Sequence, residues 1–106
     1  MPDARLALTT CHSTAQAAQL ASALLKRRVV ACCTVLPGAT SVFWWNGRIT
    51  KEREVVCLLK TQADRVEALK SALAELHPYD TPECLVLPVE AGLDKYLKWL
   101  KTETRG

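Results

Sequence analysis

The spacing of apolar residues predicts a strand and then an amphipathic helix at the start of the chain. Residues 5–10 alternate weakly between apolar and polar side chains, whereas the apolar residues of 14–28 recur every three or four positions. Ser13 stands three residues before Gln16, which is the spacing of a capping box at a helix N-terminus. The first strand should therefore end before Ser13, and the helix should begin just after it.

A long β-hairpin is predicted next. Residues 29–35 are rich in β-branched and cysteine side chains, a Pro-Gly pair interrupts them, and strand character resumes over 40–45. Asn46-Gly47 follows, and both residues tolerate the positive φ angles of a type I′ turn. The return strand is predicted over residues 48–61.

The remaining pattern predicts a helix, a short strand and a last helix. Asp64 and Glu67 repeat the capping spacing ahead of an apolar stripe, and Pro78 should end this helix at the residue before it. Residues 84–89 predict a strand whose proline favours an edge of the sheet or the end of a strand, and residues 93–100 predict a C-terminal helix.

The resulting order, βαββαβ followed by a helix, predicts an α+β fold. We expect a ferredoxin-like sandwich of four antiparallel strands with two helices on one face and an extra C-terminal helix. A chain of 106 residues has the length of one domain, so residues 1–106 are expected to form it alone. Because this order hosts many unrelated functions, the function has to be argued from side chains.

The predicted return strand is too long for a domain of this size. Its fourteen residues would span about 46 Å at ~3.3 Å each, whereas a small domain is roughly 30 Å across. The hairpin tip should therefore overhang, carrying Phe43, Trp44 and Trp45 on its two faces. These three aromatic residues are predicted to form the interface of a closed homo-oligomer, which would cover them. The alternative is that the chain's own C-terminal helix buries the indoles.

Composition and charge limit the classes of partner. With 49% hydrophobic and 24% charged residues, the chain is typical of globular proteins rather than of disordered or membrane-spanning ones. No signal-peptide pattern opens it, so we expect a cytoplasmic protein without a membrane partner. The net charge is +3, and the basic cluster at 26–28 suits the C-terminal dipole of a helix, so nucleic acid is not expected. The five cysteines form no CxxC motif and are expected mostly to be small core residues.

The segment HPYDTPE, residues 77–83, concentrates possible metal ligands. His77 offers an imidazole, Glu83 offers carboxylate oxygens and Cys11 could add sulfur, a combination that suits copper or zinc. No closely spaced histidine pair is present, so no metal is expected to be obligatory, and a weak Cu(II) or other divalent site is the expectation. The alternative is structural: His77 ends the helix, the prolines stiffen the turn, and Glu83 pairs with Lys60.

A ligand cleft is the second candidate site. Lys60, Tyr79 and an indole from Trp44 or Trp99, together with His77 and Glu83, would combine aromatic walls with a few charges at one end of the sheet. We expect such a cleft between subunits. The chain shows no nucleophile with a base partner, no P-loop and no aromatic RNA-binding motif, so it is not expected to be an enzyme or an RNA-binding module.

Several stretches, in one continuous order, resemble the CutA divalent-cation tolerance family. They are ACCTVLPGATS at 31–41, WWNGRI at 44–49, EV at 54–55, LKT at 59–61, HPYDTPE at 77–83 and YLKW at 96–99. The resemblance implies a homotrimer similar in plan to PII-type signalling proteins, with clefts between subunits and a role in tolerance to copper and other divalent metals. The rival hypothesis is a regulatory or scaffold trimer that binds a small molecule or a partner protein, with metal binding incidental.

The resemblance also implies a copper site. In some bacterial relatives, a cysteine that closes the first strand is taken as a copper ligand together with the histidine of the HPY motif. Here the histidine corresponds to His77, whereas Thr9 stands at the cysteine position, with Cys11 and His12 two and three residues later. A copper site in this chain would therefore need Cys11 or His12 to reach His77.

Overall fold

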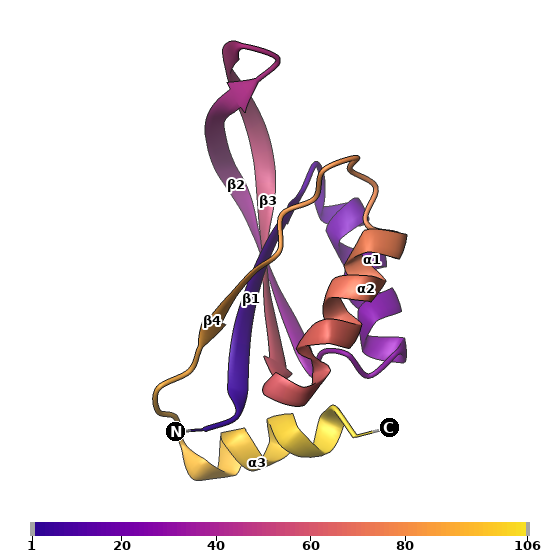
Figure 1. Ribbon diagram of the computed structural model, residues 1–106, viewed down its shortest axis with the longest axis vertical. Helices are drawn as coiled ribbons and strands as arrows, with labels where there is room; N and C mark the ends of the chain where they lie inside the picture. The colour runs from indigo at the N-terminus through magenta and orange to yellow at the C-terminus, as the bar shows by residue number, and fades with distance from the viewer. Residues whose placement is uncertain (1, 106) are drawn as a thin grey trace.

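The structure, a computed structural model, describes residues 2–105. Its elements, in chain order, are β1 (Ala4–Cys11), α1 (Thr14–Lys26), β2 (Cys32–Trp45), β3 (Arg48–Gln62), a 3₁₀ turn (Ala63–Arg65), α2 (Val66–Leu76), β4 (Leu85–Pro88) and α3 (Asp94–Glu103). The predicted order of strands and helices is confirmed (Figure 1).

The strands form one antiparallel sheet in the order β2-β3-β1-β4. Helices α1 and α2 lie side by side on one face of the sheet, and α3 lies across the end that is near the N-terminus (Figure 1). The prediction that the last strand lies at an edge is confirmed. None of the helices in the described part of the chain combines the length and apolar character needed to cross a bilayer.

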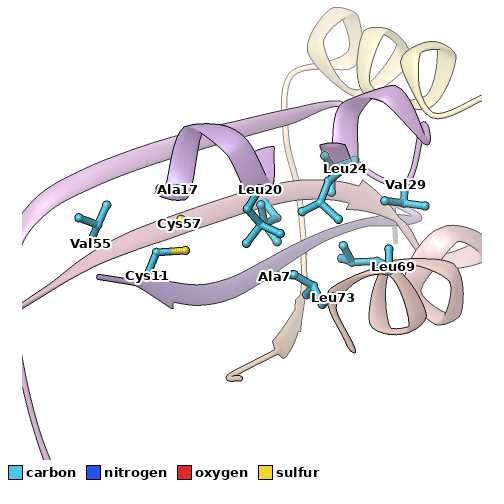
Figure 2. Close-up of a cluster of buried hydrophobic side chains, with 13 residues drawn as sticks. Ala7, Cys11, Ala17, Leu20, Leu24, Val29, Val55, Cys57, Leu69 and Leu73 are labelled. Atoms are coloured by element: carbon cyan, nitrogen blue, oxygen red, sulfur yellow. The ribbon is translucent and has the colours of Figure 1, made fainter. Parts of the chain in front are cut away.

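The main hydrophobic core fills the space between the sheet and helices α1 and α2 (Figure 2). Leu20 and Leu24 come from α1, and Leu69 and Leu73 come from α2; all four are at most 5% exposed. Burying each such side chain stabilises the fold by roughly 2 kcal/mol.

The five cysteines fall into two groups. Cys57 is buried in the core, and Cys33 and Cys84 pack against it, as predicted. Cys11 is also buried in the core, although the sequence suggested it as a sulfur ligand. Cys32 was expected there too, but alternation along β2 places it on the opposite face of the sheet, where it contacts Lys60.

One of the two predicted helix caps forms. The hydroxyl of Ser13 accepts a hydrogen bond from the Gln16 N–H at 3.1 Å, and the Gln16 side chain accepts one from the His12 N–H at 2.8 Å. The cap predicted at Asp64 is wrong. The chain forms a 3₁₀ turn there, and the Asp64 carboxylate pairs with Arg105 instead of with the first backbone N–H groups of α2.

The strand predicted from residue 29 begins at Cys32. Arg28 takes a positive φ of 58°, which ends the preceding helical turn, and Val29 and Val30 then pack in the core. The Pro-Gly pair at 37–38 does not interrupt β2, but it produces a bulge in the pairing with β3 between Leu36 and Ala39.

The outer parts of β2 and β3, residues 39–54, form a two-stranded arm that projects beyond the helices (Figure 1). Asn46 and Gly47 close it with φ angles of 50° and 75°, so the predicted turn is confirmed. The molecule measures 44 × 26 × 22 Å, and the arm lies along its long axis. Trp44 is 71% exposed and Trp45 is 50% exposed. Because α3 lies at the opposite end, the alternative that it buries these indoles is wrong.

The face of the sheet that points away from α1 and α2 is also apolar. Val86 packs against the core, so its neighbours Leu85 and Leu87 point to the opposite face, where they are 58% and 47% exposed. Leu36 on β2 is 47% exposed. The arm and this face therefore leave a series of large apolar side chains uncovered in the single chain.

Candidate functional site

A groove of about 800 Å³ runs along the arm, from the strand residues next to its turn to the place where β2 and β3 leave the body of the molecule. The β1–α1 turn and the loop after α2 complete its walls. Its charged and aromatic lining comprises Glu52, Glu54, Asp80, Glu83, His12, Phe43, Trp44, Trp45 and Tyr79. No lysine or arginine belongs to the lining among residues 2–105, so the groove is acidic.

His77 fixes the loop that forms one wall of the groove. It is the C-terminal capping residue of α2 and is only 7% exposed. The backbone N–H of Tyr79 donates to Nδ1 of His77 at 3.1 Å, so Nε2 carries the proton and donates to the carbonyl oxygen of Thr10 at 2.8 Å. Burial of the neutral ring holds the pKa of His77 below its usual value, and this outweighs the opposing effects of the Thr10 carbonyl and Glu54.

Tyr79 and Glu54 connect this loop to the base of the arm. The Tyr79 hydroxyl donates to Oε2 of Glu54 at 2.7 Å. Burial opposes ionisation of Glu54, but hydrogen bonds from Ser41, Tyr79 and Thr10 outweigh it and hold the pKa of Glu54 below its usual value. Burial, followed by the hydrogen bond to Glu54, raises the pKa of Tyr79. Tyr79 therefore stays protonated, and Glu54 stays charged.

His12 brings a second imidazole to the groove. Its ring packs on Tyr79 with the ring centres 4.6 Å apart, and the ring of His77 contacts the same tyrosine at 4.7 Å. His12 is exposed, unlike His77. The groove therefore offers solvent one imidazole nitrogen donor and several carboxylates.

The predicted metal ligands are not brought together. Cys11 points into the core and is 0% exposed, and burial raises the pKa of its thiol to about 12 (Figure 2). His77 uses both ring nitrogens in hydrogen bonds, which leaves no lone pair directed at the groove. Glu83 does line the groove. Within residues 2–105, no three His, Cys, Asp or Glu side chains are arranged to hold a metal ion, so the single chain does not bring His77, Cys11 and Glu83 together as a preformed site.

The predicted cleft residues separate into those in the groove and those elsewhere. Tyr79 and Trp44 line the groove. Lys60 does not line the groove. On the sheet it lies opposite Leu6 of β1, four residues before Thr10, whose carbonyl oxygen binds His77 at the groove.

Lys60 has other partners. It donates to the hydroxyl of Thr34 and contacts the Cys32 sulfur at 3.5 Å. The predicted pair between Lys60 and Glu83 is therefore not formed. Trp99 lies on α3, stacked near Tyr96 with ring centres 5.5 Å apart, at the far end of the molecule.

The sequence interpretation missed two acidic residues of the groove and gave His12 too small a role. Glu52 and Glu54 lie two positions apart on β3, so both project from the same face of a strand. That alternation was available in the sequence, and it marks an acidic stripe on the arm. His12 was considered only beside Cys11, as a replacement for the cysteine that some relatives carry at the position of Thr9, although the turn after β1 directs the histidine outward and Cys11 inward.

The fold and the groove define a small α+β protein with an acidic, aromatic groove along a projecting hairpin. Residues 5–103 match the family model described as CutA1 divalent ion tolerance protein. The chain therefore belongs to the CutA1 divalent ion tolerance family.

Individual relatives agree with this assignment over nearly the whole chain. The divalent-cation tolerance protein CutA of Pectobacterium atrosepticum is 45% identical over 103 residues, which cover 97% of this chain and 94% of the relative. That of Citrobacter koseri is 44% identical over 105 residues, covering 99% and 91%.

Solved structures of relatives share the fold. CutA from Xylella fastidiosa superposes with a TM-score of 0.92 at 39% identity, covering 96% of this chain and 98% of the other. The periplasmic divalent cation tolerance protein CutA from Archaeoglobus fulgidus gives a TM-score of 0.92 at 27% identity, covering 96% and 99%.

Proposed function

We propose that this chain acts in divalent-cation tolerance by binding divalent ions, Cu(II) among them, weakly at the acidic groove of a homotrimer. The observation that carries the proposal is the lining of the groove: four carboxylates and an exposed imidazole, with no lysine or arginine in the lining among residues 2–105. Such a lining attracts cations.

The donor set favours His12 over the ligands expected from the sequence. An imidazole with carboxylate oxygens suits Cu(II) or Zn²⁺. His12 is exposed at the groove, and Glu83 and Glu52 are exposed on its walls. Because these groups are spread over different elements instead of closing on one point, a bound ion would keep several water ligands, and its affinity would be modest.

A trimer is supported by the uncovered surface of the single chain. Val42, Trp44 and Ile49 form an apolar strip on one face of the arm, with exposures of 60%, 71% and 67%. Together with the open face of the sheet, this strip would be covered by identical neighbours in a closed ring. The strand order β2-β3-β1-β4, with α1 and α2 on one face of the sheet, supports the proposed ferredoxin-like sandwich.

The proposed role is to bind divalent ions and not to catalyse a reaction. The proposed location is the cytoplasm. The groove presents no activated nucleophile, because Tyr79 stays protonated and the thiol of Cys11 is buried. All five cysteines are free, which fits a reducing compartment. Cell fractionation that recovered the protein from a periplasmic or secreted fraction would contradict the location.

Calorimetric titration of Cu(II) and Zn²⁺ into metal-free protein tests the binding role. We expect the double variant His12→Ala/Glu83→Gln to bind Cu(II) at least fivefold more weakly, and binding should also weaken near pH 5, where protons compete for imidazole. The matched control is Cys11→Ser, which removes the buried thiol and should leave the affinity unchanged. A Cu(II) affinity that falls with Cys11→Ser but not with the double variant would overturn the proposed ligand set.

A regulatory trimer that binds a small molecule is the second candidate. The groove volume of about 800 Å³ and its aromatic walls fall in the range of small-molecule sites. The acidic lining favours an organic cation over a nucleotide phosphate. Thermal-shift measurements with polyamines and with ATP, each in the presence of EDTA, test this candidate: stabilisation by an amine alone would support it, whereas stabilisation by neither would exclude it.

A further inference from the structure

Three cysteine thiols lie next to one another in the main core, on the side of the sheet that faces α1 and α2. Cys11 comes from β1, Cys57 from β3 and Cys33 from β2, and Figure 2 shows the first two of them. Cys57 is the central one, because its sulfur hydrogen-bonds with Cys33 of one neighbouring strand and with Cys11 of the other. None of the three lines the groove, so the proposed function does not use them.

The three thiols differ in their access to solvent. Cys11 and Cys57 are 0% and 1% exposed, whereas Cys33 is only partly buried, because β2 lies at an edge of the sheet. Cys33 faces the helices, and not the open face of the sheet that the proposed trimer covers. A small oxidant can therefore reach Cys33, and through it the buried sulfur of Cys57.

A buried hydroxyl beside the three thiols favours a chemical role for them over a purely structural one. Thr9 of β1 lies directly opposite Cys57 of β3. Its side chain is 0% exposed, and Oγ1 has no hydrogen-bond partner among residues 2–105. A buried polar group without a partner costs stability, and redox or catalytic sites are among the places where such groups occur. Aliphatic side chains would fill this layer of the core without that cost.

The arrangement of the thiols favours a disulfide over a bound metal ion. The sulfurs follow one another across the sheet, from β2 over β3 to β1, instead of converging on one point. In the described part of the chain, no three His, Cys, Asp or Glu side chains are placed to hold a metal ion. A disulfide needs only two neighbouring sulfurs, and the pair that includes the partly exposed Cys33 is the one an oxidant can reach.

Cys33 and Cys57 occupy diagonal positions on neighbouring strands. Cys33 is paired with Leu59, two residues beyond Cys57 on β3. Diagonal neighbours are somewhat farther apart than an unstrained disulfide allows, so closing the bond draws β2 toward β3. β2 can move because it is an edge strand with a bulge that begins at Leu36. A strained disulfide is readily reduced, so the bond is expected to be reversible.

We propose that Cys33 and Cys57 form a reversible disulfide when the protein is exposed to hydrogen peroxide. Peroxide oxidises the Cys33 thiol to a sulfenic acid and releases one water. The Cys57 thiolate then attacks that sulfur, the S–S bond forms, and the sulfenic oxygen leaves as hydroxide, which takes up the proton that Cys57 had released. Two thiols are oxidised to one disulfide, and one peroxide is reduced to two waters. The inference goes beyond the proposed function and depends on neither the groove nor the trimer.

The hydrogen bond between the two thiols prepares this reaction. It lowers the pKa of Cys57 to about 7, against the opposing effect of burial and with help from Cys11. The same bond raises the pKa of Cys33, so the pair gives up one proton and keeps the other. The retained proton lies between the two sulfurs and can pass from one to the other. Either cysteine can therefore be the thiolate, which is the reactive form.

The disulfide joins the two strands of the arm where they enter the body of the molecule. Residues 33 and 57 bracket the arm, residues 39–54, so the bond closes a loop that contains the whole arm. The oxidation state of the core thus determines how firmly β2 is held on β3 below the arm.

Peroxide treatment of the intact protein in EDTA, followed by thiol counting and peptide mapping, tests the proposal. The free thiols should fall from five to three per chain, and dithiothreitol should restore all five. After alkylation, trypsin should release residues 29–48 linked to residues 54–60, because it cleaves after lysine and arginine. The peptide that contains Cys11, residues 6–26, should stay unlinked.

Serine variants assign the bond and supply a matched control. Cys32 shares the peptide 29–48 with Cys33 but lies on the other face of the sheet, so Cys32→Ser should form the linked peptides at the wild-type rate. In Cys33→Ser, linkage of residues 54–60 to any other peptide should be at least tenfold slower, because the thiols that remain in the cluster are buried. Circular dichroism should show native folding in both variants, since each replaced side chain is partly exposed.

The mapping of the wild type does not depend on any variant folding. No loss of thiols, a bond that includes Cys32 or Cys11, or conversion of Cys33 to a sulfinic acid without a linked partner would each overturn the proposal.

Discussion

His77 anchors the HPYDTPE loop to the rest of the fold through both ring nitrogens. The sequence had predicted instead that this imidazole binds a metal ion. Its two hydrogen bonds hold the end of α2 against β1 and fix the Tyr79 backbone. Protonation would place a second N–H against the Tyr79 N–H and break that bond. The imidazole can therefore make both hydrogen bonds only in its neutral state.

This requirement for a neutral His77 predicts that the stability of the fold depends on pH. Burial lowers the pKa of His77 in the folded protein, while the unfolded chain keeps the ordinary value of about 6.5. The unfolded state then binds more protons as pH falls below about 6.5, so the contribution of His77 is complete above that pH and is lost below it. Urea unfolding should give a lower free energy of unfolding at pH 5 than at pH 7.5.

His77→Gln separates this effect from the other titrating groups. The amide cannot titrate, so the loss between pH 7.5 and pH 5 should shrink, and the missing hydrogen bond should lower the free energy of unfolding by about 1–3 kcal/mol at pH 7.5. Glu54, whose pKa is also lowered, acts in a more acidic window, below its ordinary value of 4.5. An unchanged pH profile in His77→Gln would show that His77 is not the source.

The individual groove residues show how far the site could be predicted from the sequence. Of the predicted cleft residues, Tyr79 and Trp44 both line the groove, whereas the alternative indole of Trp99 lies on α3. The inclusion of Lys60 was wrong because its position depends on the register between β1 and β3, which pairs it with Leu6. Local spacing carries no information about that register.

The elements were more predictable than the site. Their order follows from periodicity and from the Asn46-Gly47 turn, both of which act over a few residues. The cap at Asp64 was wrong because a partner distant in sequence, Arg105, competes for the carboxylate. Sequence spacing identifies a possible cap, and tertiary contacts decide whether it forms.

The two capping positions therefore make a matched pair of variants. Ser13→Ala removes a hydrogen bond to the first turn of α1 and should lower the free energy of unfolding by about 1 kcal/mol. Asp64→Ala removes only an exposed ion pair and should cost clearly less. Chemical denaturation of both variants checks this, and equal losses would contradict the assignment of the caps.

At the scale of the whole molecule, the arm is the feature that we expect to determine the oligomeric state. Trp44 and Ile49 face each other across the hairpin and are both mostly exposed. We expect light scattering to give the mass of three chains at micromolar concentration, with the tryptophan emission shifted to shorter wavelength on assembly. Trp44→Glu/Ile49→Glu should yield a folded monomer, because charge at the centre of an apolar contact opposes its burial.

The control for this prediction is Lys51→Glu, an exposed charge change on the same arm that should leave the mass unchanged. A wild-type mass of one chain, or a double variant that still assembles, would contradict the role of the arm.

Pro88 at the end of β4 has a consequence for this architecture. The strand lies at an edge of the sheet and is only four residues long, and its proline lacks the N–H that a further strand would need. Sheets that expose two edges tend to stack into fibrils when copies add without limit. Because β4 is short and ends in a proline, it is a poor template for a further strand. Newly synthesised chains are therefore less prone to aggregate through this edge before they assemble.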